Sequence, residues 1–289
     1  MVLTAAILWG LSGTAAQVLF SVDAVHPGWL VTIRMGIAGV LLLIASGVRQ
    51  GFYGLFAVWR HPAQSGRLLV YALLGLLGVQ YSYLAAIAYS NAATATLLQY
   101  IGPTLIMLYL AVRSGRLPSL REGLAVIFTL IGTALLVTNG DMQRVNVSRL
   151  GLIWGLLSAV TLAFYTVFPE RLLHRFGSLA IVGWSMVLGA LVMSFRDPPW
   201  RVAPFSVVHG WLLIMFIALF GTLLAFFFYS ASLRYLTPAQ VGLLATVEPL
   251  AATVAAMLIL NVRLGMFAIF GGLLILLSVM LLTRSSRAI

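Results

Sequence analysis

The amino-acid sequence predicts an all-α integral membrane protein, with ten transmembrane helices arranged as two inverted five-helix repeats. The 289-residue chain is 62% hydrophobic and only 8% charged, whereas soluble domains contain about 25% charged residues. Its apolar residues form runs of about 20, enough for a helix to cross a hydrocarbon core about 30 Å thick. Several aromatic and proline positions also recur between the two halves. Because no soluble domain of this size hides so much apolar surface, we expect lipid to surround the chain.

Each apolar segment is predicted to be one span. The first is a retained helix rather than a signal peptide, because no basic residue precedes Arg34. The ten predicted spans are residues 2–20, 28–48, 67–89, 92–112, 118–138, 149–168, 177–195, 209–233, 237–260 and 264–283. The connection 49–66 contains FYGLFAVW and fits either a helix in the membrane interface or an ordinary loop. The connection 196–206 cannot be helical throughout, because Pro198 and Pro199 interrupt it.

Arginine positions predict the orientation, because basic residues are retained on the cytoplasmic side of an inner membrane. With the N-terminus inside, the cytoplasmic segments hold Arg49, Arg60, Arg67, Arg113, Arg116, Arg121, Arg171, Arg175, Arg234, Arg284 and Arg287. The outer loops hold only Arg144, Arg149, Arg196, Arg201 and Arg263. We therefore expect a multi-pass protein of a bacterial-type inner membrane, with both termini in the cytoplasm.

Composition also excludes several functions. The net charge of +11 comes from arginines spread between apolar runs rather than from one basic surface, which argues against nucleic-acid binding. The chain has no Cys, its four His are not spaced as metal ligands, and it has no Lys for a phosphate-binding loop. We expect no cofactor and no metal. An intramembrane transferase is disfavoured because the acidic residues other than Glu248 are scattered and form no pair at helical spacing: Asp23, Glu122, Asp141, Glu170 and Asp197.

An internal repeat links the spans to a mechanism. A shift of 146 positions superposes Tyr83 on Tyr229, Tyr89 on Tyr235, Leu97 on Leu243, Leu98 on Leu244 and Pro103 on Pro249, and a shift of 145 superposes Trp9-Gly10 on Trp154-Gly155. The repeats are predicted at residues 1–139 and 149–284, with five spans each. An odd number of spans inverts the second copy in the membrane. In transporters built this way, the substrate binds between the copies near the midplane.

Four segments carry a resemblance to a known family. They are AILWGLSGTAA, VTIRMGIAGVLLL, AIAYSNAATATLLQYIGPTLIMLYL and ASLRYLTPAQVGLLATVEPLAATVAAMLIL. Together they resemble the ten-span EamA-type branch of the drug/metabolite transporter superfamily, and within it the YddG-type amino-acid exporters. The resemblance implies secondary export or exchange of amino acids, related metabolites or drugs without a bound cofactor. Many members close the ninth span with Gly-Glu, whereas this chain has Leu260-Asn261-Val262-Arg263, so no acidic role carries over there.

Glu248 is the one carboxylate predicted deep inside a span. Burying an ionised group there costs at least about 2.5 to 3.5 kcal/mol, so it must face a cavity, pair or become protonated. It fits a contact for a substrate ammonium, a proton-coupling carboxylate, or a structural hydrogen bond at the kink expected at Pro249. Pro103 is the corresponding kink position in the first half.

Arg34 lies about six residues into the second span, within reach of the headgroups for a long side chain. The alternative is that it turns inward and binds a substrate carboxylate or pairs with Glu248. A cavity holding both charges would suit a zwitterion.

Six further side chains are predicted to line the same midplane cavity. Aromatic rings with small neighbours suit apolar side chains and, weakly, an ammonium group, although helix packing explains each one singly. The polar members also fit interhelical hydrogen bonds, as do Gln80 and Asn91. The six residues are Trp9, Gln17, Tyr83, Gln99, Trp154 and Tyr229.

The predicted function is secondary transport of amino acids, aromatic or apolar ones included, or of related small metabolites by alternating access. The expected partners are a small-molecule substrate and the lipid bilayer, with H⁺ as a candidate coupling ion. Drugs, nucleosides and nucleotide sugars are alternative substrate classes. A channel or receptor is a further alternative, which an inverted repeat disfavours. The sequence does not specify the oligomeric state.

Overall fold

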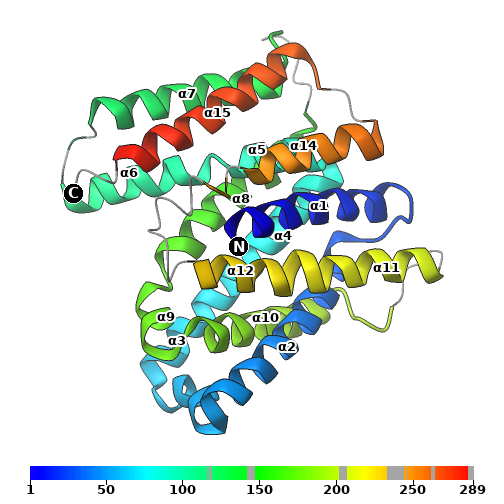
Figure 1. The fold of residues 1–289 in the computed structure, drawn as a ribbon, viewed down its shortest axis with the longest axis vertical. Helices are drawn as coiled ribbons and strands as arrows, with labels where there is room; N and C mark the ends of the chain where they lie inside the picture. The colour runs from blue at the N-terminus through cyan, green and yellow to red at the C-terminus, as the bar shows by residue number, and fades with distance from the viewer. Residues whose placement is uncertain are drawn as a thin grey trace.

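The computed structural model describes residues 1–115, 117, 119–141, 147–201, 207–232, 244–245, 247–261 and 264–285. Within these ranges all regular secondary structure is helical, as the sequence predicts. In Figure 1 helix α1 begins and helix α15 ends on the same side of the bundle. Some residues used in the sequence argument lie outside the described ranges: Arg116, Arg144, Arg234, Tyr235, Leu243, Arg263 and Arg287.

The helices follow the predicted apolar segments. The first half contains α1 (Val2–Ser21), α2 (Pro27–Leu55), η1 (Ala57–Arg60), α3 (Pro62–Val70), η2 (Tyr71–Leu77), α4 (Gly78–Tyr89), α5 (Ala92–Gln99), α6 (Gly102–Ser114) and α7 (Leu120–Thr138). The second half contains α8 (Arg149–Val167), α9 (Glu170–Phe176), α10 (Ser178–Ser194), α11 (Val207–Ala218), η3 (Leu219–Leu224), α12 (Ala225–Ser232), α14 (Val247–Leu260) and α15 (Met266–Ser285).

Several of these helices are long and apolar enough to cross a membrane. Six such segments occur among the described residues, or seven if the bent pair α9–α10 is one span: Val2–Ser21, Pro27–Arg60, Pro62–Tyr89, Ala92–Arg113, Arg149–Val167, His209–Tyr229, and Glu170–Phe176 with Ser178–Ser194. Two shorter apolar helices, Val247–Leu260 and Met266–Leu281, follow. The molecule is therefore an all-helical membrane protein.

The two halves are interlocked. Helix α1 packs against η3, α12 and α14 of the second half, while α8 packs against η2, α4, α5 and α6 of the first. Two further pairs join equivalent helices: α2 with α10, and α7 with α15. Figure 1 shows the α7–α15 pair at one end of the long axis and the α2–α10 pair at the other. The remaining helices lie between these ends, where the predicted site residues are found.

Two spans contain a π-helical stretch at matching positions. Segments η2 and η3 are π-helical, and they overlap when the first half is shifted by the 146 positions that superpose Tyr83 on Tyr229. The hydroxyl of Thr222 donates to the carbonyl of Ile217, five residues earlier, at 2.9 Å. Such stretches occur preferentially at functional sites. Each packs on the first helix of the other half, η2 on α8 and η3 on α1.

Helices α7 and α15 approach closely at a pair of glycines. A methyl group added to Gly132 would lie 2.6 Å from the carbonyl oxygen of Gly271, and one on Gly271 would collide with the carbonyl oxygen of Gly132. Small residues let membrane helices pack backbone to backbone, since lipid provides no hydrophobic force between them.

We predict that Gly132→Ala destabilises the protein in detergent by about 1 to 3 kcal/mol, because the added methyl group overpacks this crossing. The matched control is Gly123→Ala on the same helix, where an added methyl group meets no atom within 4 Å. That control should be neutral or stabilising by about 0.5 to 1 kcal/mol through helix propensity. Thermal unfolding in one detergent measures both variants, and equal melting temperatures would contradict the packing described here.

Candidate substrate site

Each half of the chain has a helix that begins close to a proline. The chain leaves helix α5 at Gln99 and resumes as α6 at Gly102, with Pro103 in the first turn. In the second half, Pro249 lies in the first turn of α14. A proline costs no hydrogen bond in the first turn, because the amide groups there have no partner within the helix. Each predicted kink proline therefore marks the start of a helix.

Tyr100 joins the end of α5 to the residues just before α14. Its side chain is 7% exposed, and its hydroxyl donates to the backbone carbonyl of Ala245 at 2.5 Å. The same hydroxyl lies 3.3 Å from Oε2 of Glu248. Tyr100 thus supplies a donor to a carbonyl just before α14 and reaches the buried carboxylate from the opposite half.

Glu248 is buried, at 9% exposed, within the first turn of α14. A carboxylate there is favoured by the helix dipole. Tyr83, Tyr100 and Tyr229 all lie within electrostatic range of it. No ion pair to Glu248 occurs within the described ranges, so its only side-chain hydrogen bond there is to Tyr100.

Arg34 turns into the bundle. It is 6% exposed, which rules out a side chain reaching the headgroups. Its Nε has no hydrogen-bond partner, and no ion pair to Glu248 or another carboxylate is present among the residues described. The pairing of Arg34 with Glu248 considered from the sequence is therefore not found.

Tyr83 interacts electrostatically with both buried charges, Arg34 and Glu248. Its hydroxyl also forms a hydrogen bond with the hydroxyl of Thr96 on α5, with the two oxygens 2.8 Å apart. Among the described residues the site therefore presents a guanidinium and a carboxyl group, neither in an ion pair and both within electrostatic reach of one tyrosine.

Aromatic rings contact one another in two groups. Trp9 packs against Phe226 and Tyr229, with ring centroids 5.3 and 5.2 Å apart. Trp154 packs edge-on against Tyr81 at 5.2 Å. Each tryptophan thus contacts an aromatic residue of the other half. Sequence reasoning paired Trp9 and Tyr229 in one cavity but did not identify Tyr81 or Phe226.

The predicted polar residues separate into different roles. The side-chain oxygen of Gln17 accepts a hydrogen bond from the backbone N–H of Ala92 at 2.8 Å, and Asn91 caps the same helix by accepting from Thr94 N–H at 2.9 Å. Both residues therefore hold the start of α5, and the substrate contact predicted for Gln17 stays a prediction. Gln99 is 8% exposed at the end of α5, beside Tyr100. The Nε2 of Gln80 is buried without a partner.

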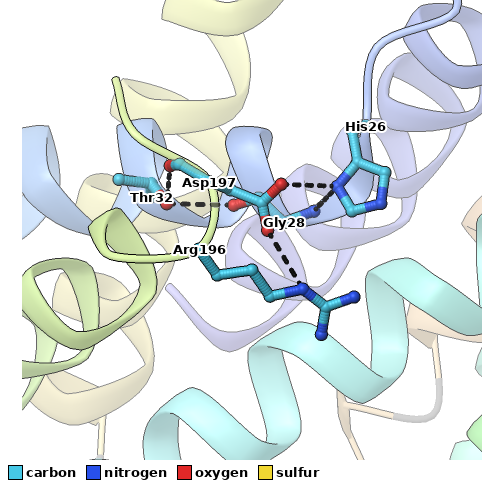
Figure 2. A network of polar contacts seen from close by, with 5 residues as sticks. All are labelled: His26, Gly28, Thr32, Arg196 and Asp197. Carbon is cyan, nitrogen blue, oxygen red and sulfur yellow. Dashed lines mark hydrogen bonds and ion pairs between the residues drawn. The ribbon is translucent and has the colours of Figure 1, made fainter. Parts of the chain in front are cut away.

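A polar network closes one end of the α2–α10 pair (Figure 2). His26 Nδ1 lies 2.9 Å from Oδ1 of Asp197, and the hydroxyl of Thr32 donates to the backbone carbonyl of Asp197 at 3.0 Å. Arg196 Nε lies 3.8 Å from Oδ2 of Asp197, and its guanidinium sits 5.8 Å from the ring centroid of Tyr81. The network therefore ties the start of α2 to the chain after α10 and reaches the Tyr81–Trp154 contact. The sequence argument placed His26, Arg196 and Asp197 outside the predicted spans and Thr32 inside the second one, and predicted no contact between them.

Comparison with known proteins identifies the family to which this chain belongs. Residues 1–138 and residues 149–284 each match the model of the EamA-like transporter family. The chain belongs to the EamA-like transporter family. This membership implies a duplicated architecture for the EamA-like chain and makes it a transporter rather than an enzyme.

Individual relatives support the same assignment. The EamA-like chain is 34% identical over 289 residues to the uncharacterised inner membrane transporter YicL of Salmonella typhimurium, covering 99% of this chain and 95% of that protein. It is 26% identical over 261 residues to the uncharacterised transporter YdeK of Bacillus subtilis, covering 88% and 86% of the two chains. A crystal structure described only as that of a protein has the same fold, with a TM-score of 0.67 and 20% identity over 99% of this chain and 96% of that one. The EamA-like chain is thus a multi-pass inner-membrane transporter, and neither relative's name states a substrate.

We predict that Tyr100→Phe lowers stability in detergent by about 1 to 3 kcal/mol, because it leaves the buried carbonyl of Ala245 without its donor. Tyr109→Phe is the matched control, since Tyr109 is 49% exposed on α6. Thermal unfolding of both variants measures the difference. A Tyr100→Phe protein as stable as the control would show that this hydroxyl does not stabilise the contact between the end of α5 and the start of α14.

Proposed function

We propose that this chain is a secondary transporter of amino acids, with the specificity of the YddG-type exporters that it resembles. In this proposal ten spans form two inverted repeats, 1–139 and 149–284, with both termini in the cytoplasm. The observation that carries the proposal is the buried pair of opposite charges, Arg34 and Glu248, each without a charged partner in the part of the chain that the structure describes.

The charge argument favours a zwitterionic substrate. Burying either ion inside a membrane costs at least about 2.5 to 3.5 kcal/mol, and no ion-pair partner within the described residues offsets that cost. An amino acid offers a carboxylate to Arg34 and an ammonium to Glu248 at once. Both residues are close enough to Tyr83 to interact with it electrostatically.

The surrounding rings favour apolar or aromatic side chains on that amino acid. Trp9, Trp154 and Tyr229 provide faces that bind apolar groups and, weakly, cations. Gln99 adds an amide at the end of α5. We assign substrate contacts to Trp9, Arg34, Tyr83, Gln99, Trp154, Tyr229 and Glu248, and hinge positions to Pro103 and Pro249.

The way in which the first helix of each half packs against the other half supports alternating access. Helices α1 and α8 pack into the opposite half in equivalent ways, and the π-helical segments η2 and η3 lie on those same contacts. In a pair of inverted repeats, exchanging the two conformations of the halves opens the central site to the other side. During this conformational change, the ring contacts of Trp9 and of Trp154 with the opposite half would separate.

We predict that Arg34→Gln and Glu248→Gln each reduce counterflow of amino acids in proteoliposomes by about tenfold or more, the equivalent of one lost interaction of about 1.4 kcal/mol. Removing the cation should weaken binding of the carboxylate, and removing the anion should weaken binding of the ammonium. The matched controls are Arg149→Gln and Glu170→Gln, both exposed, which should transport normally.

The substrate panel should include nucleosides and a nucleotide sugar. Transport of these solutes with no amino acid moved would overturn the proposed substrate class. Full activity of both variants would remove Arg34 and Glu248 from the mechanism. A Glu248→Gln protein that exchanges amino acids but no longer responds to a pH gradient would assign Glu248 to H⁺ coupling.

We also predict that Asp197→Asn increases access to the site from the side where α2 begins, because it weakens the contact with His26. The chain contains no cysteine, so a single Thr96→Cys substitution reports access by its rate of reaction with an impermeant thiol reagent. Arg201→Gln is the control, because Arg201 is exposed on the same connection. An unchanged labelling rate in Asp197→Asn would show that the network does not restrain opening.

A further inference from the structure

A group of exposed aromatic side chains lies at the end of the α2–α10 pair opposite the His26–Asp197 network. Helix α2 is interrupted at Gly51, where φ is +71°, a value that favours glycine. The next two residues, Phe52 and Tyr53, are 76% and 78% exposed. The break therefore redirects the last turn of α2 so that two rings face outward.

A hydrogen bond and ring contacts to Trp184 hold this turn in place. The indole N–H of Trp184 on α10 donates to the carbonyl of Leu55 at 2.9 Å. The same indole contacts Phe56 and Trp59 edge-on, with ring centroids 5.2 and 5.4 Å away. The outward orientation of Phe52 and Tyr53 is thus fixed by packing beneath them.

Cationic groups lie over the exposed ring of Tyr53 and over the buried ring of Phe176. The guanidinium of Arg60 lies 5.1 Å from the ring centroid of Tyr53, and that of Arg175 lies 5.2 Å from the centroid of Phe176. Arg175 Nη2 is also 3.3 Å from His61 Nε2. Because arginine only donates hydrogen bonds, His61 accepts at Nε2 and carries its proton on Nδ1. Arg60, His61 and Arg175 are all exposed and offer donors from η1 and α9.

No carboxylate in the described part of the chain lies within ion-pair distance of Arg60 or Arg175. Arg49, Arg67 and Arg171 lie on the neighbouring elements, where Glu170 is the only acidic residue. Figure 1 places α3 and α9 together at this end of α2 and α10, and the two helices are in contact. The surface therefore carries an excess of positive charge next to apolar rings.

We propose that Arg60, His61 and Arg175 bind the phosphate of an anionic phospholipid, whose acyl chains contact Phe52, Tyr53 and Phe56. Arginine binds phosphate oxygens through several donors at once. Aromatic residues are enriched at the level of the headgroups, and basic clusters beside membrane helices bind anionic lipids. Exposed phenyl rings next to the cations favour a lipid over a soluble phosphate, because a soluble anion would leave those rings in water.

Native mass spectrometry of the intact protein tests this proposal. The protein would be incubated in detergent with equal amounts of phosphatidylglycerol and phosphatidylcholine, and the lipids retained on each molecule would be counted. We expect the native chain to retain phosphatidylglycerol preferentially and Arg60→Gln/Arg175→Gln to lose about tenfold or more of that preference. The charge-matched control is Arg149→Gln/Arg201→Gln, which removes two exposed arginines from the opposite end of the bundle and should keep the preference.

A lysine variant and a competition with inorganic phosphate test the proposal further. Arg60→Lys/Arg175→Lys keeps the charge, so it should retain more phosphatidylglycerol than the glutamine variant. Inorganic phosphate added in excess should not displace the lipid, and complete displacement would identify a soluble-anion site instead. Equal lipid retention by the native chain and Arg60→Gln/Arg175→Gln would overturn the proposal. The measurement does not involve transport, so its failure leaves the proposed substrate untouched.

Discussion

The hydrogen bond from Tyr100 to the carbonyl of Ala245 is the contact on which the centre of this transporter depends. Inside a bilayer no water is available for a free backbone group, so a helix can be interrupted only where protein supplies the missing partner. Here a tyrosine in the break between α5 and α6 donates to a carbonyl of the other half, just before α14. This hydrogen bond therefore joins the two halves beside the buried Glu248.

Hydrophobic runs predicted the helical architecture well, because twenty apolar residues have one low-energy arrangement in lipid. The matching Trp-Gly, tyrosine and proline positions also directed attention to Trp9, Trp154, Tyr83 and Tyr229, whose role in substrate binding stays a prediction. The positions at which helices begin near the two prolines were harder to predict. Proline was expected to kink a helix, whereas Pro103 and Pro249 lie in first turns. A proline by itself does not specify on which side of it the helix ends.

Other features depended on contacts that sequence patterns do not contain. Gln17 bonds to a backbone group 75 residues away, so its role in holding α5 had no local signal. Arg34 was predicted about six residues into a span, where its side chain could reach the headgroups or turn inward, and only the packing of α2 decided between the two. Tyr100 and Tyr81 were overlooked because tyrosine is common in apolar spans. Only the offset of 145 positions between Tyr100 and Ala245 hinted that the two positions would meet.

The paired π-helical segments have a geometric consequence. Each α-helical residue turns the chain by about 100°, so one additional residue per turn rotates everything beyond it by about that angle. The side chains of α4 therefore point in a different direction from the one they would take if a regular α-helix continued from α3. The same holds for α12 after α11. Each span can change its facing halfway through the lipid with its hydrogen-bond ladder unbroken, which a proline kink does not allow. Sliding the bulge by one residue would redirect the aromatic side chains without moving the ends of the span.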